Sequence, residues 1–201
     1  YAWGVLVIPT GLIPGKKRPV MVCQHGLEHL TYDLLNTDTS SKAYKYYKAL
    51  PYSLAERGYI TYMPANPYRG EDKFRMLQRK ANPLGLSMFS FIIGQHQRLV
   101  EWLQQQPFVE AEKIGFFGLS YGGATALRVP AIIKAYKLSI CVANFNDWVK
   151  KCASVDLPFS YMYNAEYEIQ DWDLGHTFNT AEMAALIAPR PFMAQRGSFD
   201  P

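Results

Sequence analysis

Short apolar runs alternate with longer stretches of helical periodicity along the chain. The runs typical of strands cover positions 4–8, 19–24, 59–63, 113–117, 138–143 and 191–195. The helical patterns cover 43–57, 87–106 and 122–129. Pro51 is expected to interrupt the first helix and Pro130 to end the third, because proline cannot donate the helical hydrogen bond. This alternation predicts an α/β fold with a mostly parallel central sheet flanked by helices.

Three connections between these elements add detail. The first two strands are joined by a turn rich in Gly, Pro and Lys, which favours a hairpin at one side of the sheet. Residues 64–85 hold three prolines and several charges, so we expect a long excursion there. Residues 144–189 are too long for a bare crossover and carry eight aromatic residues. That insertion is either a cap over a substrate pocket or a second helical layer with its own core.

Composition limits the classes of protein that the chain can represent. With 201 residues, of which 49% are apolar, residues 1–201 are expected to form one domain. A net charge of +4 without a long basic run argues against a nucleic-acid partner. The apolar runs are far shorter than the roughly 18 residues that a membrane span needs. The chain starts in mid-pattern and stops directly after a strand, which predicts a domain incomplete at both ends and indicates no cellular compartment.

The pattern Gly-x-Ser-x-Gly at 118–122 carries the strongest chemical signal. It follows the apolar strand 113–117 and opens a helix, which is the setting that a nucleophile elbow requires. Ser120 is expected at positive φ on the tip of a sharp turn. Gly118 and Gly122 lack Cβ atoms, so the strand and the helix can approach closely around it. The helix N-terminus then directs free N–H groups toward a developing oxyanion.

A second element, Gln24-His25-Gly26-Leu27, directly follows the strand 19–24. In this architecture the loop after such a strand supplies the other oxyanion donor. The backbone N–H groups of Tyr121 and Leu27 are therefore the expected oxyanion hole. His25 is interpreted as a structural residue that fixes the loop, and His29 has no assignable role. His96 lies on the apolar face of the helix 87–106, so it is interpreted as a core histidine.

Four segments together resemble a known family. They are Gly-Leu-Ser-Tyr-Gly-Gly at 118–123, Gln-His-Gly at 24–26, Ala-Glu-Arg-Gly-Tyr at 55–59 and Ala-Pro-Arg-Pro-Phe at 188–192. The chain resembles the α/β-hydrolase superfamily, and more narrowly its dienelactone-hydrolase-like and acetyl-xylan-esterase-like serine esterases. The resemblance implies an α/β-hydrolase fold, with 144–189 as an insertion between the sixth and seventh strands of that fold. It also implies a Ser–acid–His triad and an acyl-enzyme, with no cofactor and no metal. The dienelactone hydrolases proper use a cysteine nucleophile, whereas this chain has Ser120.

The resemblance places the triad acid at Asp200, after the strand 191–195, with Asp147 as the fallback one strand earlier. The fold orders its triad as Ser, acid, His, and only Pro201 follows Asp200. The base is then expected beyond Pro201, which would leave this chain nearly inactive. Two alternatives stay open: His176 reaches the site from the insertion, or the protein is catalytically inactive.

The sequence therefore predicts a serine carboxylic-ester hydrolase, or carboxylesterase, for small acyl esters. Acetylated carbohydrate is a candidate substrate, and neither nucleic acid nor membrane is an expected partner. The first alternative is a serine peptidase of the prolyl-oligopeptidase type, in which Glu166 and Glu168 would hold a peptide amino terminus. The second is an inactive binding module with the α/β-hydrolase fold.

Overall fold

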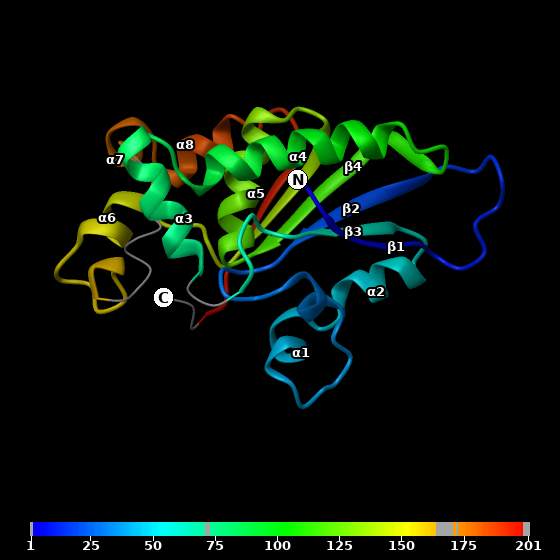
Figure 1. Ribbon diagram of the computed structural model, residues 1–201, viewed down its shortest axis with the longest axis horizontal. Helices are drawn as coiled ribbons and strands as arrows, with labels where there is room; N and C mark the ends of the chain where they lie inside the picture. The colour runs from blue at the N-terminus through cyan, green and yellow to red at the C-terminus, as the bar shows by residue number, and fades with distance from the viewer. Residues whose placement is uncertain (1, 71–72, 164–170, 172, 199–201) are drawn as a thin grey trace.

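A six-stranded sheet runs through the computed structural model, which describes residues 2–70, 73–163, 171 and 173–198. Its strand order is β1-β3-β2-β4-β5-β6 (Figure 1). The strands are β1 (Gly4–Val7), β2 (Arg18–Gln24), β3 (Ile60–Pro64), β4 (Val109–Leu119), β5 (Tyr136–Val142) and β6 (Phe192–Gln195). All neighbouring pairs are parallel except β1 and β3. The mostly parallel sheet predicted from the sequence is therefore confirmed.

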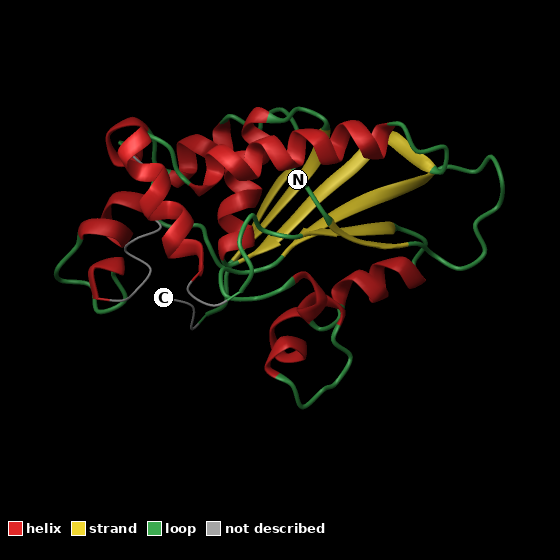
Figure 2. Ribbon diagram, viewed as in Figure 1, coloured by secondary structure: helices red, strands yellow, loops and turns green. Residues whose placement is uncertain are grey.

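Helices lie on both faces of this sheet (Figure 2). The α-helices are α1 (Lys42–Tyr47), α2 (Leu50–Glu56), α3 (Lys73–Ala81), α4 (Met88–Gln104), α5 (Tyr121–Ile132), α6 (Trp148–Ala153), α7 (Leu174–Thr177) and α8 (Thr180–Ala185). Short 3₁₀ turns are η1 (Thr31–Leu35), η2 (Asn82–Leu84) and η3 (Tyr161–Tyr163). Helices α4 and α5 cover one face, and α1 and α2 lie on the other (Figure 1).

Strand β2 shows how the sequence pattern produces these layers. Val20 and Val22 belong to the main hydrophobic cluster, which also contains the buried residues of α4 and α5. Met21 and Cys23 belong to a second cluster, together with Leu34 from the opposite face. Successive side chains of a strand point to opposite faces, so a strand buried on both sides reads as a continuous apolar run.

The expected hairpin between the first two strands is wrong. β1 instead pairs antiparallel with β3, from Gly4 opposite Pro64 to Val7 opposite Thr61, and β3 separates it from β2. The connection between β1 and β2 is much longer than the two to five residues typical of hairpin loops, so it can cross to a more distant position in the sheet.

Proline 130 does not end the third helix, as the sequence predicted, but lies inside α5. A proline in a helix leaves the carbonyl four residues earlier without its usual donor. Here the hydroxyl of Ser139, on β5, donates a hydrogen bond of 2.6 Å to the carbonyl of Ala126. The neighbouring strand therefore satisfies the carbonyl that Pro130 leaves free, and α5 continues to Ile132.

The excursion expected over 64–85 contains secondary structure that the sequence pattern did not reveal, namely α3 and η2. The helix expected over 43–57 is divided into α1 and α2, with Lys48 and Ala49 at positive φ between them. In the described part of the chain, no helix is both long enough and apolar enough to cross a membrane.

The described part of the insertion packs against the rest of the domain. Trp148 and Tyr161 are buried in the main hydrophobic cluster, whereas Phe159 and Tyr163 are exposed. Arg128 of α5 forms an ion pair of 2.9 Å with Asp171. Its guanidinium also lies over the ring of Trp148, 4.9 Å from the ring centroid. These contacts join the insertion to the helix that follows the elbow.

Candidate active site

Ser120 lies between the end of β4 and the start of α5, at φ 59° and ψ −118°. This positive φ is the strained backbone that the Gly-x-Ser-x-Gly pattern predicted. The Ser120 N–H donates to the carbonyl of Val142 on β5 at 2.9 Å, and its own carbonyl accepts from Ala124 at 3.0 Å. Tyr121 is in the first turn of α5, where a backbone N–H has no intrahelical acceptor. The turn is therefore fixed on both sides while an N–H group beside the serine remains available.

The two glycines of the motif are required by close packing. A Cβ on Gly118 would lie 1.8 Å from the carbonyl oxygen of Gly122. A Cβ on Gly122 would lie 2.3 Å from the carbonyl oxygen of Gln24 at the end of β2. No side chain fits at either distance, so helix, strand and the loop after β2 meet at Ser120 only because these residues are glycine.

The loop after β2 is fixed by hydrogen bonds to buried side chains. The N–H of Gly26 donates to the hydroxyl of Tyr47 at 2.8 Å. The Nδ1 atom of His25 is 2.8 Å from the Gly26 carbonyl oxygen and must carry the proton of that bond, since a carbonyl only accepts. In a planar trans peptide the C=O and the next N–H point in opposite directions. The N–H of Leu27 therefore points away from the His25 ring.

The next peptide is held by a chain of polar side chains. The hydroxyl of Tyr68 donates to the carbonyl of Leu27 at 2.8 Å. Asn66 donates to the Tyr68 hydroxyl at 2.9 Å, and Gln24 donates to Asn66 at 3.0 Å. With the described residues, the Leu27 N–H itself makes no hydrogen bond. The loop is thus held at the peptide groups on either side of the predicted oxyanion donor.

The chain of hydrogen bonds continues into the core through His96. Its Nε2 lies 3.3 Å from Gln24 Oε1, and its Nδ1 lies 2.7 Å from the hydroxyl of Tyr136. Because Oε1 only accepts, Nε2 carries the proton and Tyr136 donates to Nδ1. Burial lowers the pKa of His96 to about 3, and burial lowers that of His25 to about 4. Both rings are neutral near pH 7, and His96 is a core histidine with both ring nitrogens bonded, as the sequence indicated.

A cavity of about 220 Å³ opens at Ser120. Its lining residues are Gly26, Glu28, His29, Tyr46, Tyr47, Leu119 and Ser120. A Cβ placed on Gly26 would lie 3.5 Å from the Cβ of Ser120, so the loop after β2 is in direct proximity to the serine. His29, to which the sequence assigned no role, lines this cavity. Only the sequence spacing of four between His29 and Asp33 could have pointed to it, and that signal is weak.

Other candidate residues lie elsewhere. The carboxylate of Asp147 accepts from the Lys150 N–H at 3.0 Å as the N-cap of α6, and this hydrogen bond lowers its pKa. The side chain of His176 is 91% exposed and pairs with Asp173. Neither Asp147 nor His176 lines the cavity at Ser120.

Three further candidates cannot be placed. Asp200, Glu166 and Glu168 lie outside the described residues. The described residue nearest to Asp200 in an element is Gln195, which ends β6 opposite Val142 of β5. Within the described part of the chain, no three His, Cys, Asp or Glu side chains are grouped as metal ligands.

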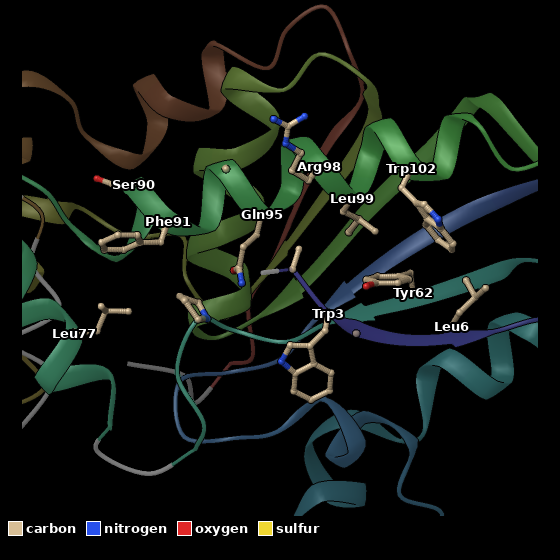
Figure 3. A pocket seen from close by; sticks show the side chains of 14 residues that line it. Trp3, Leu6, Tyr62, Leu77, Ser90, Phe91, Gln95, Arg98, Leu99 and Trp102 are labelled. Carbon is tan, nitrogen blue, oxygen red and sulfur yellow. The ribbon is translucent and has the colours of Figure 1, made fainter.

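A larger hollow of about 1050 Å³ lies between β1, β3 and α4, apart from Ser120 (Figure 3). Trp3, Tyr62 and Trp102 line it together with Gln95 and Arg98. Among the described residues that line it there is no histidine and no carboxylate, so it offers a nucleophile neither of its usual triad partners. The smaller cavity, which contains Ser120, is therefore the candidate active site.

The strand–elbow–helix arrangement and the sheet topology define an α/β-hydrolase fold, which confirms the resemblance inferred from the sequence. The chain belongs to the prolyl oligopeptidase family, because the family model matches residues 93–201, more than half of its length. The matched part contains Ser120 and both elbow glycines. The comparison with curated proteins finds no significant match.

Solved structures of esterases and of a peptidase share the fold at low sequence identity. A Bacteroides fragilis protein assigned as an acetyl xylan esterase has a TM-score of 0.73 and 19% identity, over 94% of this chain and 54% of its own. An acetyl xylan esterase from Paenibacillus sp. R4 has a TM-score of 0.62 and 14% identity, over 98% and 73%. Dipeptidyl peptidase 4 of Porphyromonas gingivalis has a TM-score of 0.56 and 20% identity, over 97% and 29%. This chain thus spans about half of the Bacteroides protein.

Proposed function

We propose that this domain is a serine carboxylic-ester hydrolase that acts on small acyl esters such as acetylated carbohydrate. The observation that carries the proposal is the position of Ser120, at positive φ between β4 and α5, on the wall of a cavity that also contains the fixed loop after β2. The cavity is small, about 220 Å³, which suits a short acyl group. The similarity to acetyl xylan esterases supports the same substrate class.

The reaction that we propose has two steps. The Oγ of Ser120 attacks the ester carbonyl and gives up its proton to a base, and a tetrahedral oxyanion forms. The N–H groups of Tyr121 and Leu27 donate to that oxyanion, which is worth about 3 kcal/mol of barrier for each donor. The alcohol takes up the proton and leaves, and water then hydrolyses the acyl-enzyme to release the acid and the free serine.

Asp200 is proposed as the acid that orients the catalytic histidine. The strand β6 that precedes it lies parallel to β5, and the Ala143 N–H donates to the Gln195 carbonyl at 2.9 Å. The Ser120 N–H donates to the adjacent residue Val142, so a single strand, β5, separates the end of β6 from the elbow. Because the carboxyl ends of parallel strands meet at one edge of a sheet, this topology is compatible with an acid after β5 or after β6. The carboxylate of Asp147, which follows β5, already caps α6, so we favour Asp200.

A comparison of ester and amide substrates tests the proposal. The full product of the gene that encodes these residues is assayed with 4-nitrophenyl acetate and with aminoacyl-prolyl 4-nitroanilides. We expect hydrolysis of the acetate and none of the anilides, and Ser120→Ala should remove the activity. Selective cleavage of the anilides would favour the second candidate, a peptidase, which the family membership also allows. Hydrolysis that persists in Ser120→Ala would contradict both.

A further inference from the structure

His29 lies in the wall of the Ser120 cavity, outside the triad that the fold prescribes. Its Nδ1 is 3.3 Å from Oδ2 of Asp33. Its ring meets Tyr46 edge-on at 5.6 Å between centroids and meets Tyr47 at 5.2 Å. The oxygen of Asp33 that faces the ring also accepts from the Leu30 N–H at 2.7 Å. Two aromatic rings and a carboxylate that is itself held in place therefore fix the orientation of this imidazole.

The carboxylate also decides which ring nitrogen carries the proton. An ionised carboxylate only accepts, so Nδ1 of His29 donates to Asp33 and Nε2 of the neutral ring is a hydrogen-bond acceptor. The Cδ2 atom of the ring, which is bonded to Nε2, lies 3.7 Å from the point that a Cβ on Gly26 would occupy. The Cβ of Ser120 lies 3.5 Å from that same point. The ring carbon bonded to Nε2 and the Cβ of Ser120 are thus both close to Gly26 in the same cavity.

Nothing in the described part of the chain uses this acceptor. Of the described residues, only Asp33 forms a hydrogen bond with His29, and none joins His29 to Ser120. Both residues line the cavity, as does Glu28. Glu28 and His29 therefore bring hydrogen-bond acceptors to the cavity lining, which match a ligand that brings hydroxyl donors and disfavour an anionic one.

We propose that Nε2 of His29, oriented by Asp33, accepts a hydrogen bond from a hydroxyl group on the alcohol part of the ester. His29 is then a specificity-determining residue that selects esters of polyhydroxy alcohols, the class to which acetylated sugars belong. The inference rests on the proposed esterase function and adds to it the group that binds the substrate hydroxyl.

A pair of substrates with the same carbon skeleton isolates this contact. The full gene product is assayed with 2,3-dihydroxypropyl acetate and with propyl acetate, which differ only in the two hydroxyl groups. A hydrogen bond of ordinary strength corresponds to roughly a three- to tenfold difference in affinity. His29→Phe keeps a ring between Tyr46 and Tyr47 but removes the acceptor. We expect it to raise KM for the dihydroxy ester by that factor and to change kcat/KM for propyl acetate by less than about twofold.

Three further variants test the acceptor itself. His29→Gln offers an amide oxygen and should restore most of the preference for the dihydroxy ester. In Asp33→Asn the amide oxygen can take the place of Oδ2 and accept from both the Leu30 N–H and Nδ1 of His29, so this variant should keep the preference. Asp33→Ala removes that acceptor and should lose most of the preference. Equal losses on both esters in His29→Phe would overturn the proposal, because they would indicate a purely structural or a proton-accepting role.

Binding without turnover separates this inference from the function on which it rests. In the Ser120→Ala variant, titration with 2,3-dihydroxypropyl acetate should shift the imidazole NMR signals of His29 and leave those of the exposed His176 in place. Propyl acetate at the same concentrations should cause a clearly smaller shift at His29. Absence of Ser120-dependent hydrolysis with this selective shift present would reject the esterase and keep the hydroxyl site. Equal shifts with the two esters, or none, would overturn the site.

Discussion

The two walls of the Ser120 cavity are built by opposite means. The elbow is fixed by backbone contacts, the tightest of which joins residues close in sequence: a Cβ on Gly118 would lie 1.8 Å from the carbonyl oxygen of Gly122. The loop after β2 is fixed by side chains from far along the chain: Tyr47, 21 residues away from Gly26, and Tyr68, 41 residues away from Leu27. The elbow depends on the absence of side chains at its glycines, whereas the loop after β2 depends on hydrogen bonds from side chains.

This difference determines how substitutions in each wall should affect folding and stability. Close-packed backbone cannot adjust to added atoms, so a change at the elbow should disrupt the fold. A hydrogen-bonded loop that loses one partner keeps its packing but leaves a buried polar group unsatisfied. Changes there should lower stability moderately and displace the oxyanion donor. The predictions below test this contrast, from the largest expected effect to the smallest.

Gly118→Ala should be the most damaging single substitution. Its Cβ has no space beside the Gly122 carbonyl, so we expect a loss of at least about 3 kcal/mol in the free energy of unfolding, or failure to fold. The matched control is Gly94→Ala in α4, where a Cβ meets nothing within 4 Å. Alanine there should stabilise the helix by roughly 0.5–1 kcal/mol. Urea unfolding of both variants measures the difference, and equal stabilities would contradict the packing argument.

Acidification should lower the free energy of unfolding, because two histidines of the hydrogen-bond network around the loop after β2 are buried and neutral. Burial lowers the pKa of His25 to about 4 and that of His96 to about 3, below the value of about 6.5 for unfolded histidine. Between these folded and unfolded pKa values the unfolded chain binds more protons than the folded chain. The free energy of unfolding therefore falls as the pH decreases from about 6.5 toward 3. The expected total loss is several kcal/mol.

Denaturant titrations at a series of pH values follow this loss. The slope of the unfolding free energy against pH should approach that of two protons near pH 5. A stability that stays constant from pH 7 to pH 5 would show that the two rings are not held neutral in the folded protein.

Tyr68→Phe should produce a moderate effect that is specific to the site. It leaves the Leu27 carbonyl and the Asn66 amide without their partner, which costs about 1–3 kcal/mol of stability. If Leu27 supplies an oxyanion donor, kcat should fall while KM stays nearly constant. The control is Tyr163→Phe, where an exposed hydroxyl also donates to a backbone carbonyl, that of Val155. Steady-state kinetics compare the two variants, and equal kcat values would contradict the account.

Asp147→Asn should have the smallest effect. The carboxylate is exposed at the N-terminus of α6 and an asparagine can also cap a helix, so stability should change little. Esterase activity should persist, because Asp147 lies on neither wall of the cavity. Loss of activity in this variant, measured with 4-nitrophenyl acetate, would restore Asp147 as the triad acid.

The same contrast explains what could be predicted from the sequence. The elbow is largely local, so the pattern at 118–122, with the apolar strand before it and the helix after it, predicted the positive φ of Ser120 and the close approach of the glycines. His96 could be assigned to the core because helical spacing reports which face is buried. Its hydrogen-bond partners Gln24 and Tyr136 could not be named, since they come from separate strands.

The wrong predictions also concern contacts between distant segments. The partner of β1 depends on where the chain returns after β2, which no local pattern encodes. The continuation of α5 past Pro130 depends on the hydroxyl of Ser139 on the next strand. His29 was passed over because its position in the cavity arises from the folding of η1 and α1 around the loop after β2. Asp200, outside the described residues, remains a prediction.

Covalent labelling of the serine tests the central claim most directly. The full gene product is treated with a fluorophosphonate probe, and the modified residue is identified by mass spectrometry. Our account predicts a single adduct on Ser120, abolished by Ser120→Ala and by denaturation before treatment. A correctly folded protein that the probe never labels at Ser120, or labels only at another serine, would contradict it.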